Sequence, residues 1–198
     1  MKIEDILALE EGAARTAVLV AWLQSLFDDD EITPVLVGGA AVELFTNGAY
    51  ITGDIDLVGS VTPRAARALE GAGFERHGRH WIHEPAQLFV EFPGTALDPE
   101  EKAPWLELEG QRVRIISVED LLVDRLGAWE YWQSSVDGVN ALLLWWAQQE
   151  HIDTKRLEHR LAQTGWHRAW RSLFQFAERW GRGQPPAEEV EEWAKAGP

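Results

Sequence analysis

Gly53-Asp54-Ile55-Asp56-Leu57-Val58 is typical of a short β-strand that carries two acidic side chains. Successive side chains of a strand point to opposite faces, so Asp54 and Asp56 share one face, about 6.6 Å apart along the strand, and Ile55 points to the other. Carboxylate oxygens are the ligands that Mg²⁺ prefers, with phosphate and water in the remaining positions. This stretch therefore predicts a divalent-metal site on a strand, although two turn residues after Gly53 would be a simpler explanation.

A glycine pair, Gly38 and Gly39, lies sixteen residues before the acidic strand. It follows the apolar run 34–37, which is typical of a buried strand, and precedes a short helix expected over 40–45. Glycine has no Cβ, so its backbone can approach a phosphate closely, and the start of a helix offers free N–H groups to an anion. Alone, the pair would be an ordinary strand-to-helix turn; with the acidic strand after it, it predicts phosphate binding.

A third acid, Glu91, lies in the otherwise apolar run 88–92. A charge in such a run is costly unless it is paired or bound to a metal. If this strand lies beside the strand of Asp54 and Asp56, three carboxylates converge, and two Mg²⁺ ions there would orient a triphosphate and stabilise a leaving pyrophosphate. The sequence does not decide whether Glu91 holds a metal or takes a proton, and an exposed edge-strand position stays open because nothing local fixes the register.

The composition indicates a globular protein that does not bind duplex DNA. The chain has 198 residues, of which 45% are hydrophobic, and no cysteine, which excludes disulfides and thiolate chemistry. The net charge is −15, and residues 1–60 hold eleven acids against two bases, so the long-range field repels duplex DNA. The acidic start is no signal peptide and no apolar run is long enough for a membrane, so we expect a cytoplasmic protein. Eleven tryptophans permit a dimer.

The order of expected elements predicts an α+β fold, in which a small mixed β-sheet flanked by helices is followed by a C-terminal helical unit. We place the α/β core at residues 1–116 and the helical unit at 117–198. Helices are expected over 2–10, 12–28 with an end at Asp28-Asp29-Asp30, 63–69 after a cap at Thr62, and 120–126, 136–150, 153–163, 166–181 and 186–195. Strands are expected over 34–37 and 54–58 and within 74–83, 87–92 and 105–116, the last with a hairpin turn at 109–111.

The segments Val37–Ala41 and Thr52–Leu57 resemble the signature of the DNA polymerase beta-like nucleotidyltransferase superfamily. That signature is an apolar residue, Gly-Gly or Gly-Ser, a spacer, and an acid–apolar–acid strand. Further stretches look like a branch of small bacterial nucleotidyltransferases, some of which are toxin–antitoxin components: residues 73–81, 90–94 and 117–126. The resemblance covers about residues 30–150.

The resemblance implies Mg²⁺ or Mn²⁺ on Asp54, Asp56 and Glu91, with the phosphates of an NTP at the glycine pair. It also implies transfer of a nucleoside monophosphate to a hydroxyl of an RNA, a protein or a small molecule. In related proteins a basic residue near the position of Arg125 approaches the nucleotide, so Arg125 is a candidate for that contact. A cognate partner protein is expected if the chain belongs to a toxin–antitoxin pair.

Two departures from the family pattern keep alternatives open. Ala40 follows the glycine pair where many members carry a serine, and residues 47–50 contain no base where many carry Arg or Lys. The triphosphate therefore has fewer cationic contacts. This favours, as an alternative, a catalytically degenerate binding module that engages a protein partner through the helical unit. An unrelated metal-dependent phosphohydrolase would keep the acids without needing the glycine pair.

Other polar residues have simpler explanations. We expect surface or hairpin positions for the histidines, helix capping with solvent pairing for the acids at the start of the helical unit, and solvated positions for the arginines near the acidic strand. The segment 166–171 alternates aromatic residues with arginine, as nucleic-acid surfaces do, but its helical spacing favours a packed face. The histidines are His77, His80 and His83, the acids are Glu119 and Asp120, and the arginines are Arg64, Arg67 and Arg79.

Overall fold

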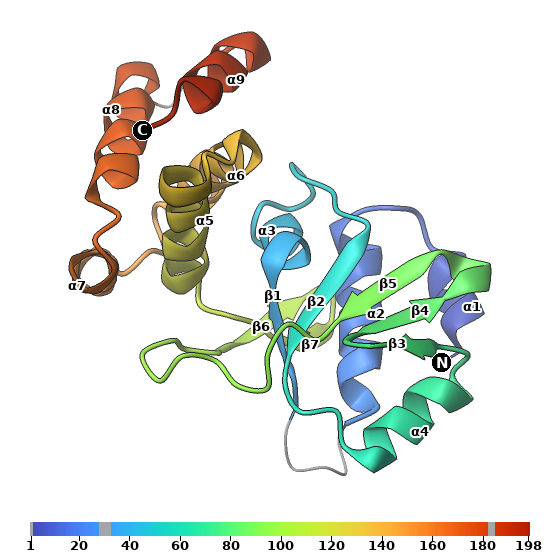
Figure 1. Ribbon diagram of the computed structural model, residues 1–198. Helices are drawn as coiled ribbons and strands as arrows, with labels where there is room; N and C mark the ends of the chain where they lie inside the picture. The colour runs from blue at the N-terminus through green and yellow to red at the C-terminus, as the bar shows by residue number, and fades with distance from the viewer. Residues whose placement is uncertain (1, 28–32, 182–184) are drawn as a thin grey trace. The chain divides into compact units, whose positions relative to one another are not determined.

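The computed structural model describes residues 2–27, 33–181 and 185–198, and the helix end expected at Asp28-Asp29-Asp30 lies outside them. The chain divides into two compact units, Met1–Ser117 and Val118–Pro198. The first holds a mixed sheet flanked by helices, and the described part of the second holds helices alone (Figure 1). The expected α+β fold, with a small mixed sheet and C-terminal helices, is confirmed.

The first unit contains helices α1 (Ile3–Leu7), α2 (Ala13–Ser25), α3 (Gly38–Phe45) and α4 (Pro63–Gly71), the 3₁₀ turn η2 (Glu84–Ala86), and strands β1 (Val35–Val37), β2 (Asp54–Val58), β3 (Glu75–His77), β4 (His80–His83), β5 (Leu88–Glu91), β6 (Trp105–Leu108) and β7 (Gln111–Arg114). The second unit contains α5 (Val118–Trp132), α6 (Ser135–Gln148), α7 (Thr154–Thr164), α8 (His167–Trp180) and α9 (Ala187–Ala196). None of the described helices combines the length and the apolar character needed to cross a membrane.

The main sheet has the strand order β1-β2-β5-β4-β3, in which β2 and β5 are parallel and the other neighbours antiparallel. One face is buried: Leu57, Trp81 and Val90 are almost fully covered. Helix α2 covers this face, behind the sheet in Figure 1, and its end packs Phe27 against Phe92 with ring centroids 5.8 Å apart. Side chains that alternate with these buried ones point to the other, more exposed face.

Strands β6 and β7 form a separate two-stranded sheet. Glu109 and Gly110 both have positive φ (50° and 72°), as a tight hairpin turn requires, so the predicted turn is confirmed. The buried side chain of Gln24 in α2 fixes this hairpin, because its amide donates to the carbonyl of Arg114 at 2.7 Å and accepts from the backbone N–H of the same residue at 3.0 Å. The hairpin thus completes the core beneath α2.

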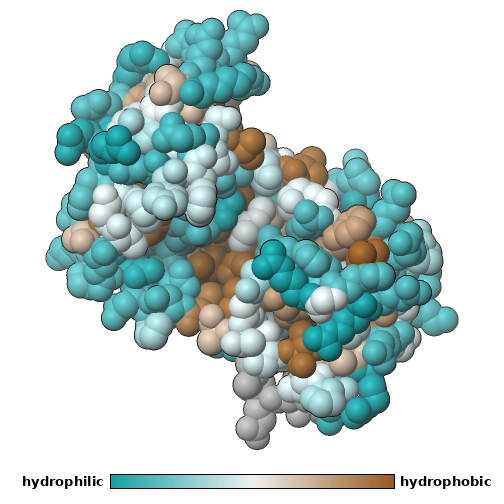
Figure 2. All heavy atoms as spheres, in the orientation of Figure 1, coloured by the Kyte–Doolittle hydropathy of each residue, from teal (hydrophilic) through white to brown (hydrophobic). Residues whose placement is uncertain are grey.

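The cap predicted for α4 is confirmed, since the Thr62 hydroxyl accepts from the Ala65 N–H at 3.1 Å. In the second unit α5 is longer than predicted and continues to Trp132. Glycine allows its close packing: a Cβ on Gly138 of α6 would lie 2.9 Å from the ring of Trp129. The face of the molecule seen in Figure 2 is mostly hydrophilic, in keeping with the net charge of −15.

The acids at the start of α5 are buried, so the expectation of a solvent-paired cap was wrong. Asp120 has a fully buried side chain that pairs with Arg156 and with Nε of Arg160, the latter at 2.7 Å. Glu119 is also buried and accepts from the Asp153 N–H at 2.9 Å. The partners of both acids lie more than thirty residues away, so these side chains bind α5 to α7 rather than cap a helix.

Candidate functional site

The turn between β1 and α3 brings a glycine against an acid of the neighbouring strand. Gly38 opens α3 with φ +67°, a conformation that favours glycine. Strand pairing places Val37 beside Asp56, and a Cβ added to Gly38 would lie only 2.1 Å from Oδ2 of Asp56. The carboxylate of Asp56 therefore occupies the space that a side chain at position 38 would need, and the glycine pair and the acidic strand form one local structure.

The parallel pairing of β2 and β5 sets Asp54 beside Phe89 and Asp56 beside Glu91. Paired residues of neighbouring strands share a face, and strands lie about 4.8 Å apart, so the three acids lie on the same, more exposed face. Asp54 is exposed and Asp56 and Glu91 are half-buried. The structure thus brings the three predicted site residues together on adjacent strands.

The carboxylate of Glu91 is engaged by two basic side chains from the β3–β4 hairpin. Its Oε1 lies 2.8 Å from Nε of Arg79, and its Oε2 lies 3.6 Å from Nδ1 of His80. Within the described residues, no group of three acidic or histidine side chains is arranged ready to hold a metal ion. The acids share a face, but Glu91 points its oxygens at the hairpin, so metal binding by the three acids stays a prediction.

The residues nevertheless fit a divalent cation. Asp54 and Asp56 supply oxygen donors from one face of a strand, and Glu91 lies in register on the next strand. Oxygen donors of this kind suit Mg²⁺ or Mn²⁺. The carboxylate of Asp56 lies against the backbone of Gly38, where a side chain would not fit. Asp54 and Asp56 would hold the metal, and Glu91 would join them if it left Arg79.

A buried acid that the sequence analysis overlooked supports the acidic strand. Glu43 of α3 is 2% exposed and accepts a hydrogen bond from the Thr16 hydroxyl at 2.8 Å. It also accepts from the N–H of Thr52 at 3.4 Å, and the Thr52 hydroxyl in turn accepts from the N–H of Asp54 at 3.4 Å. Glu43 therefore ties α2, α3 and the start of β2 together. Its signal was a lone acid in an apolar helix, where a charge needs partners.

The histidines of the β3–β4 hairpin do not converge on a metal. His77 and His80 are paired and share the exposed face, in agreement with the surface positions expected for them. His83 also lies on the hairpin, but it points to the opposite face and is buried, so of the expected surface or hairpin positions the surface one is excluded for it. Its Nδ1 accepts from the Ala86 N–H at 3.2 Å and its ring packs edge-on against Phe74. His83 is therefore a core residue.

Several other predicted positions can be described within their own unit. Arg125 of α5 pairs with two carboxylates, that of Asp124 and that of Asp137, whose Oδ1 lies at 2.7 Å. Its contact with a nucleotide stays a prediction. Arg64 and Arg67 are exposed on α4, as expected. The packed face expected for the start of α8 is confirmed, because the rings of Trp145 and Trp170 meet edge-on with centroids 5.2 Å apart, while its role toward nucleic acid is untested.

Two cavities in the first unit flank the acids. A cavity of about 430 Å³ lies beside Asp54, where Ile82 and Phe89 give it an apolar wall and Glu84 a second carboxylate. A larger cavity of about 630 Å³ lies at the opposite ends of β2 and β5 and includes Arg79. The acidic cavity therefore lies at the start of β2, and the basic one lies beyond the ends of β2 and β5, where it also includes Arg76 and Trp81 from the face opposite the acids.

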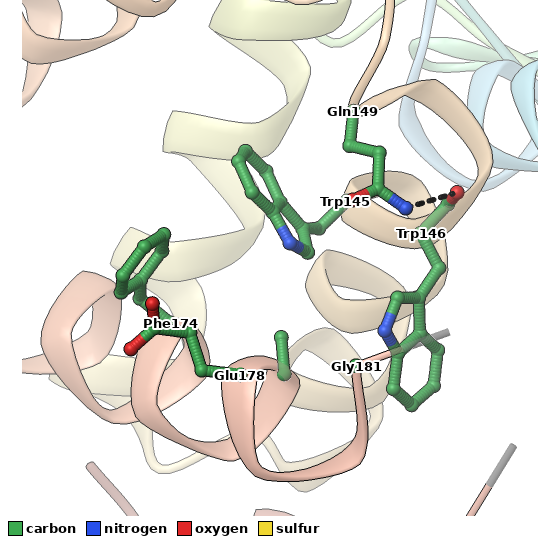
Figure 3. A pocket seen from close by; sticks show the side chains of 7 residues that line it. Trp145, Trp146, Gln149, Phe174, Glu178 and Gly181 are labelled. Carbon is green, nitrogen blue, oxygen red and sulfur yellow. Dashed lines mark hydrogen bonds between the residues drawn. The ribbon is translucent and has the colours of Figure 1, made fainter. Parts of the chain in front are cut away.

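A further cavity of about 340 Å³ lies within the helical unit, between α6 and α8. Figure 3 shows its aromatic wall, to which α6 contributes Trp145 and Trp146 and α8 contributes Phe174. Gln149 turns back to the carbonyl of Trp146 at 3.5 Å, and Glu178 is an acidic group at the wall. None of the predicted site residues lines this cavity.

Comparison with solved structures connects this geometry with a known fold. The chain superimposes on an antigenic nucleotidyltransferase-like protein from Paracoccidioides brasiliensis with a TM-score of 0.54, at 16% sequence identity, over 91% of this chain and 92% of that one. The chain has a nucleotidyltransferase-like fold. No family model and no curated protein matches the sequence. At this identity the likeness concerns the fold alone.

Proposed function

We propose that this protein is a metal-dependent nucleotidyltransferase that moves a nucleoside monophosphate from an NTP to a hydroxyl of an acceptor. The observation that carries the proposal is the contact of Gly38 with Asp56, on a strand whose other neighbour, β5, sets Glu91 beside Asp56. A tight backbone turn and three acids on one exposed face are the parts that phosphate and metal binding need. The nucleotidyltransferase-like fold of the whole chain supports the same conclusion.

In the proposed reaction, Asp54 and Asp56 would hold Mg²⁺ or Mn²⁺, whose positive charge would stabilise the charge that develops on the phosphates. The glycine pair would hold the phosphates of the NTP. The hydroxyl oxygen of the acceptor forms a bond to the α-phosphorus, and the bond from that phosphorus to the bridging oxygen breaks, so that pyrophosphate leaves. Glu91 takes the hydroxyl proton or serves as a third ligand.

The glycine pair follows β1, one neighbour of β2, and Glu91 lies on β5, the other neighbour. The proposal covers an RNA, a protein or a small molecule as the acceptor. Accordingly, the acceptor binds on the side of β2 that faces β5, and the NTP binds on the side that faces β1.

The test measures metal and nucleotide binding and then transfer. Asp56→Asn keeps the shape of the side chain and removes its charge, so we expect Mn²⁺ affinity to fall at least tenfold and NTP-dependent pyrophosphate release to stop. Glu75→Gln is the matched control, because Glu75 is an exposed acid in β3 of the same sheet. Unchanged Mn²⁺ affinity and pyrophosphate release in Asp56→Asn would exclude Asp56 as the metal ligand, and absence of NTP-dependent pyrophosphate release from the wild type would exclude the transferase. Release of orthophosphate instead would indicate a phosphohydrolase.

A second candidate is a catalytically silent binding module, in a two-gene toxin–antitoxin system, that engages a protein partner through its helical unit. It is favoured by an exposed aromatic cluster on that unit, in which Tyr131 is 66% and Trp132 73% exposed and their rings meet edge-on. Ala40 in place of serine favours it as well. Calorimetry with Mg²⁺ and each NTP separates the two: metal-dependent nucleotide binding supports the transferase, and its absence supports the module.

A further inference from the structure

The basic cavity at the ends of β2 and β5 has the composition of an anion site. It has a volume of about 630 Å³. The segments that follow the two strands line it, Gly59–Val61 after β2 and Phe92–Thr95 after β5. Two hydroxyl side chains, Ser60 and Thr95, and two arginines line it, and none of its lining residues is acidic. This composition differs sharply from that of the chain as a whole, whose net charge is −15.

Arg76 is held at this cavity by the hairpin. Its Nε donates to the carbonyl of Gly78 at 3.1 Å, and its guanidinium lies 5.8 Å from the centroid of the Trp81 ring. Trp81 itself is buried and lines the cavity, so it forms a rigid floor beneath the guanidinium. Among the described residues Arg76 has no acidic partner within salt-bridge distance. An arginine in this arrangement is suited to an anion from outside the chain.

Arg79 connects the cavity to the acids. It lines the cavity, and its Nε is also the group that lies 2.8 Å from Oε1 of Glu91. Its side chain is 63% exposed, so its own charge stays in water when it turns from Glu91 toward the cavity, and Glu91, at 23% exposed, is then left in need of another cation. An anion in the cavity therefore competes with Glu91 for the same guanidinium.

We propose that this cavity binds a phosphate monoester carried by the acceptor, and that the bound phosphate draws Arg79 away from Glu91. Arg76 and Arg79 would hold the phosphate oxygens, with hydrogen bonds from Ser60 and Thr95, and Glu91 would become free to join Asp56 at the metal. The inference rests on the proposed function, since it makes the arrival of the acceptor the event that completes the site. A small phosphorylated hydroxyl compound fits better than RNA, because the acidic surface repels a polyanion at long range.

The first experiment measures phosphate binding without metal or NTP, so that its result is independent of catalysis. The full chain is titrated with ribose 5-phosphate by calorimetry, and we expect Arg76→Gln to weaken binding at least tenfold. Arg112→Gln is the matched control: Arg112 also lies over a tryptophan ring, at 4.4 Å from that of Trp105, and beside a carboxylate, but it lies outside the cavity. Equal binding by Arg76→Gln and the wild type would overturn the proposal, as would binding of a single-stranded RNA oligonucleotide without binding of ribose 5-phosphate.

The second experiment measures the coupling through Arg79. In the wild type, ribose 5-phosphate should raise the affinity for Mn²⁺ several-fold, and Mn²⁺ should raise the affinity for ribose 5-phosphate by the same factor. Arg79→Gln should bind Mn²⁺ tightly from the outset and show no such coupling, whereas Arg76→Gln should retain the Mn²⁺ affinity of the wild type. Absence of coupling in the wild type would overturn the competition for Arg79. Phosphate binding with coupling, but without nucleotide transfer to any acceptor, would refute the proposed function and leave the phosphate site standing.

Discussion

Replacement of Gly38 by alanine tests whether the turn and the acidic strand act as one structure. Two costs follow from the geometry. At φ +67° an alanine is strained by about 1 kcal/mol. In addition, the new Cβ would lie 2.1 Å from Oδ2 of Asp56, more than an ångström inside normal contact, so the carboxylate must rotate away. The second cost falls on the group that is proposed to hold the metal.

We expect Gly38→Ala to lose about 1–3 kcal/mol of unfolding free energy. Its Mn²⁺ affinity should fall at least tenfold, which corresponds to about 1.4 kcal/mol of binding free energy. Chemical denaturation measures the first quantity, and titration of Mn²⁺ observed by electron paramagnetic resonance measures the second. The two readouts separate a folding defect from displacement of Asp56.

Gly110→Ala is the control for backbone strain alone. Gly110 has φ +72°, and a Cβ added to it would meet nothing within 4 Å. It should therefore lose a similar strain energy of about 1 kcal/mol and keep the Mn²⁺ affinity of the wild type. If Gly38→Ala also retains the wild-type Mn²⁺ affinity, Asp56 is not the metal ligand that we infer, whatever the loss of stability.

Three further outcomes follow from single side chains. Asp120→Asn should destabilise the helical unit by about 3–5 kcal/mol in chemical denaturation, because two arginines lose the charge that compensates them; a loss below about 1 kcal/mol would contradict this. Glu43→Gln should cost about 1–3 kcal/mol of unfolding free energy and increase hydrogen exchange of the Thr52 amide, and unchanged exchange would show that Glu43 does not hold that segment. The hydrogen bond and charge of Lys195 lower the pKa of Glu191. The ion pair therefore stabilises α9 at pH values above the ordinary glutamate pKa, and this stabilisation is lost as the pH falls through the lowered pKa of Glu191. An NMR titration in which Lys195→Gln leaves the pKa of Glu191 unchanged would exclude this pair as the cause.

The local part of the site was predictable from the sequence, because strand alternation and glycine geometry act over a few residues. The face shared by Asp54 and Asp56 follows from alternation alone. The position of Glu91 does not, since it depends on the pairing of β2 with β5, and a slip of one residue would turn Glu91 to the other face. The register that brings Glu91 beside Asp56 is a property of the folded sheet.

Long-range partners account for the errors. Acids in the first turn of a helix are usually explained by the helix dipole, and Glu119 and Asp120 fit that pattern. Their actual partners come from the start and the body of α7, which no local pattern indicates. The role of Arg79 likewise depends on the reversal of the chain at Gly78, whose φ of +67° turns β3 back as β4 and brings the guanidinium to Glu91. In contrast, Glu43 did carry a local signal in its apolar helix.

The ion pair between Arg79 and Glu91 offers a way to prevent the proposed transferase from hydrolysing NTP when no acceptor is bound. Glu91 has two oxygens, and both are engaged by basic groups of the β3–β4 hairpin. A metal held at Asp56, as proposed, and the guanidinium of Arg79 would therefore compete for one carboxylate, and a stronger ion pair would make a weaker metal site. The Arg79 side chain is 63% exposed, so water weakens its attraction to Glu91 and one bound anion can compete for it. In this proposal Arg79, which lies beside the three acids, keeps Glu91 from the metal until an acceptor binds.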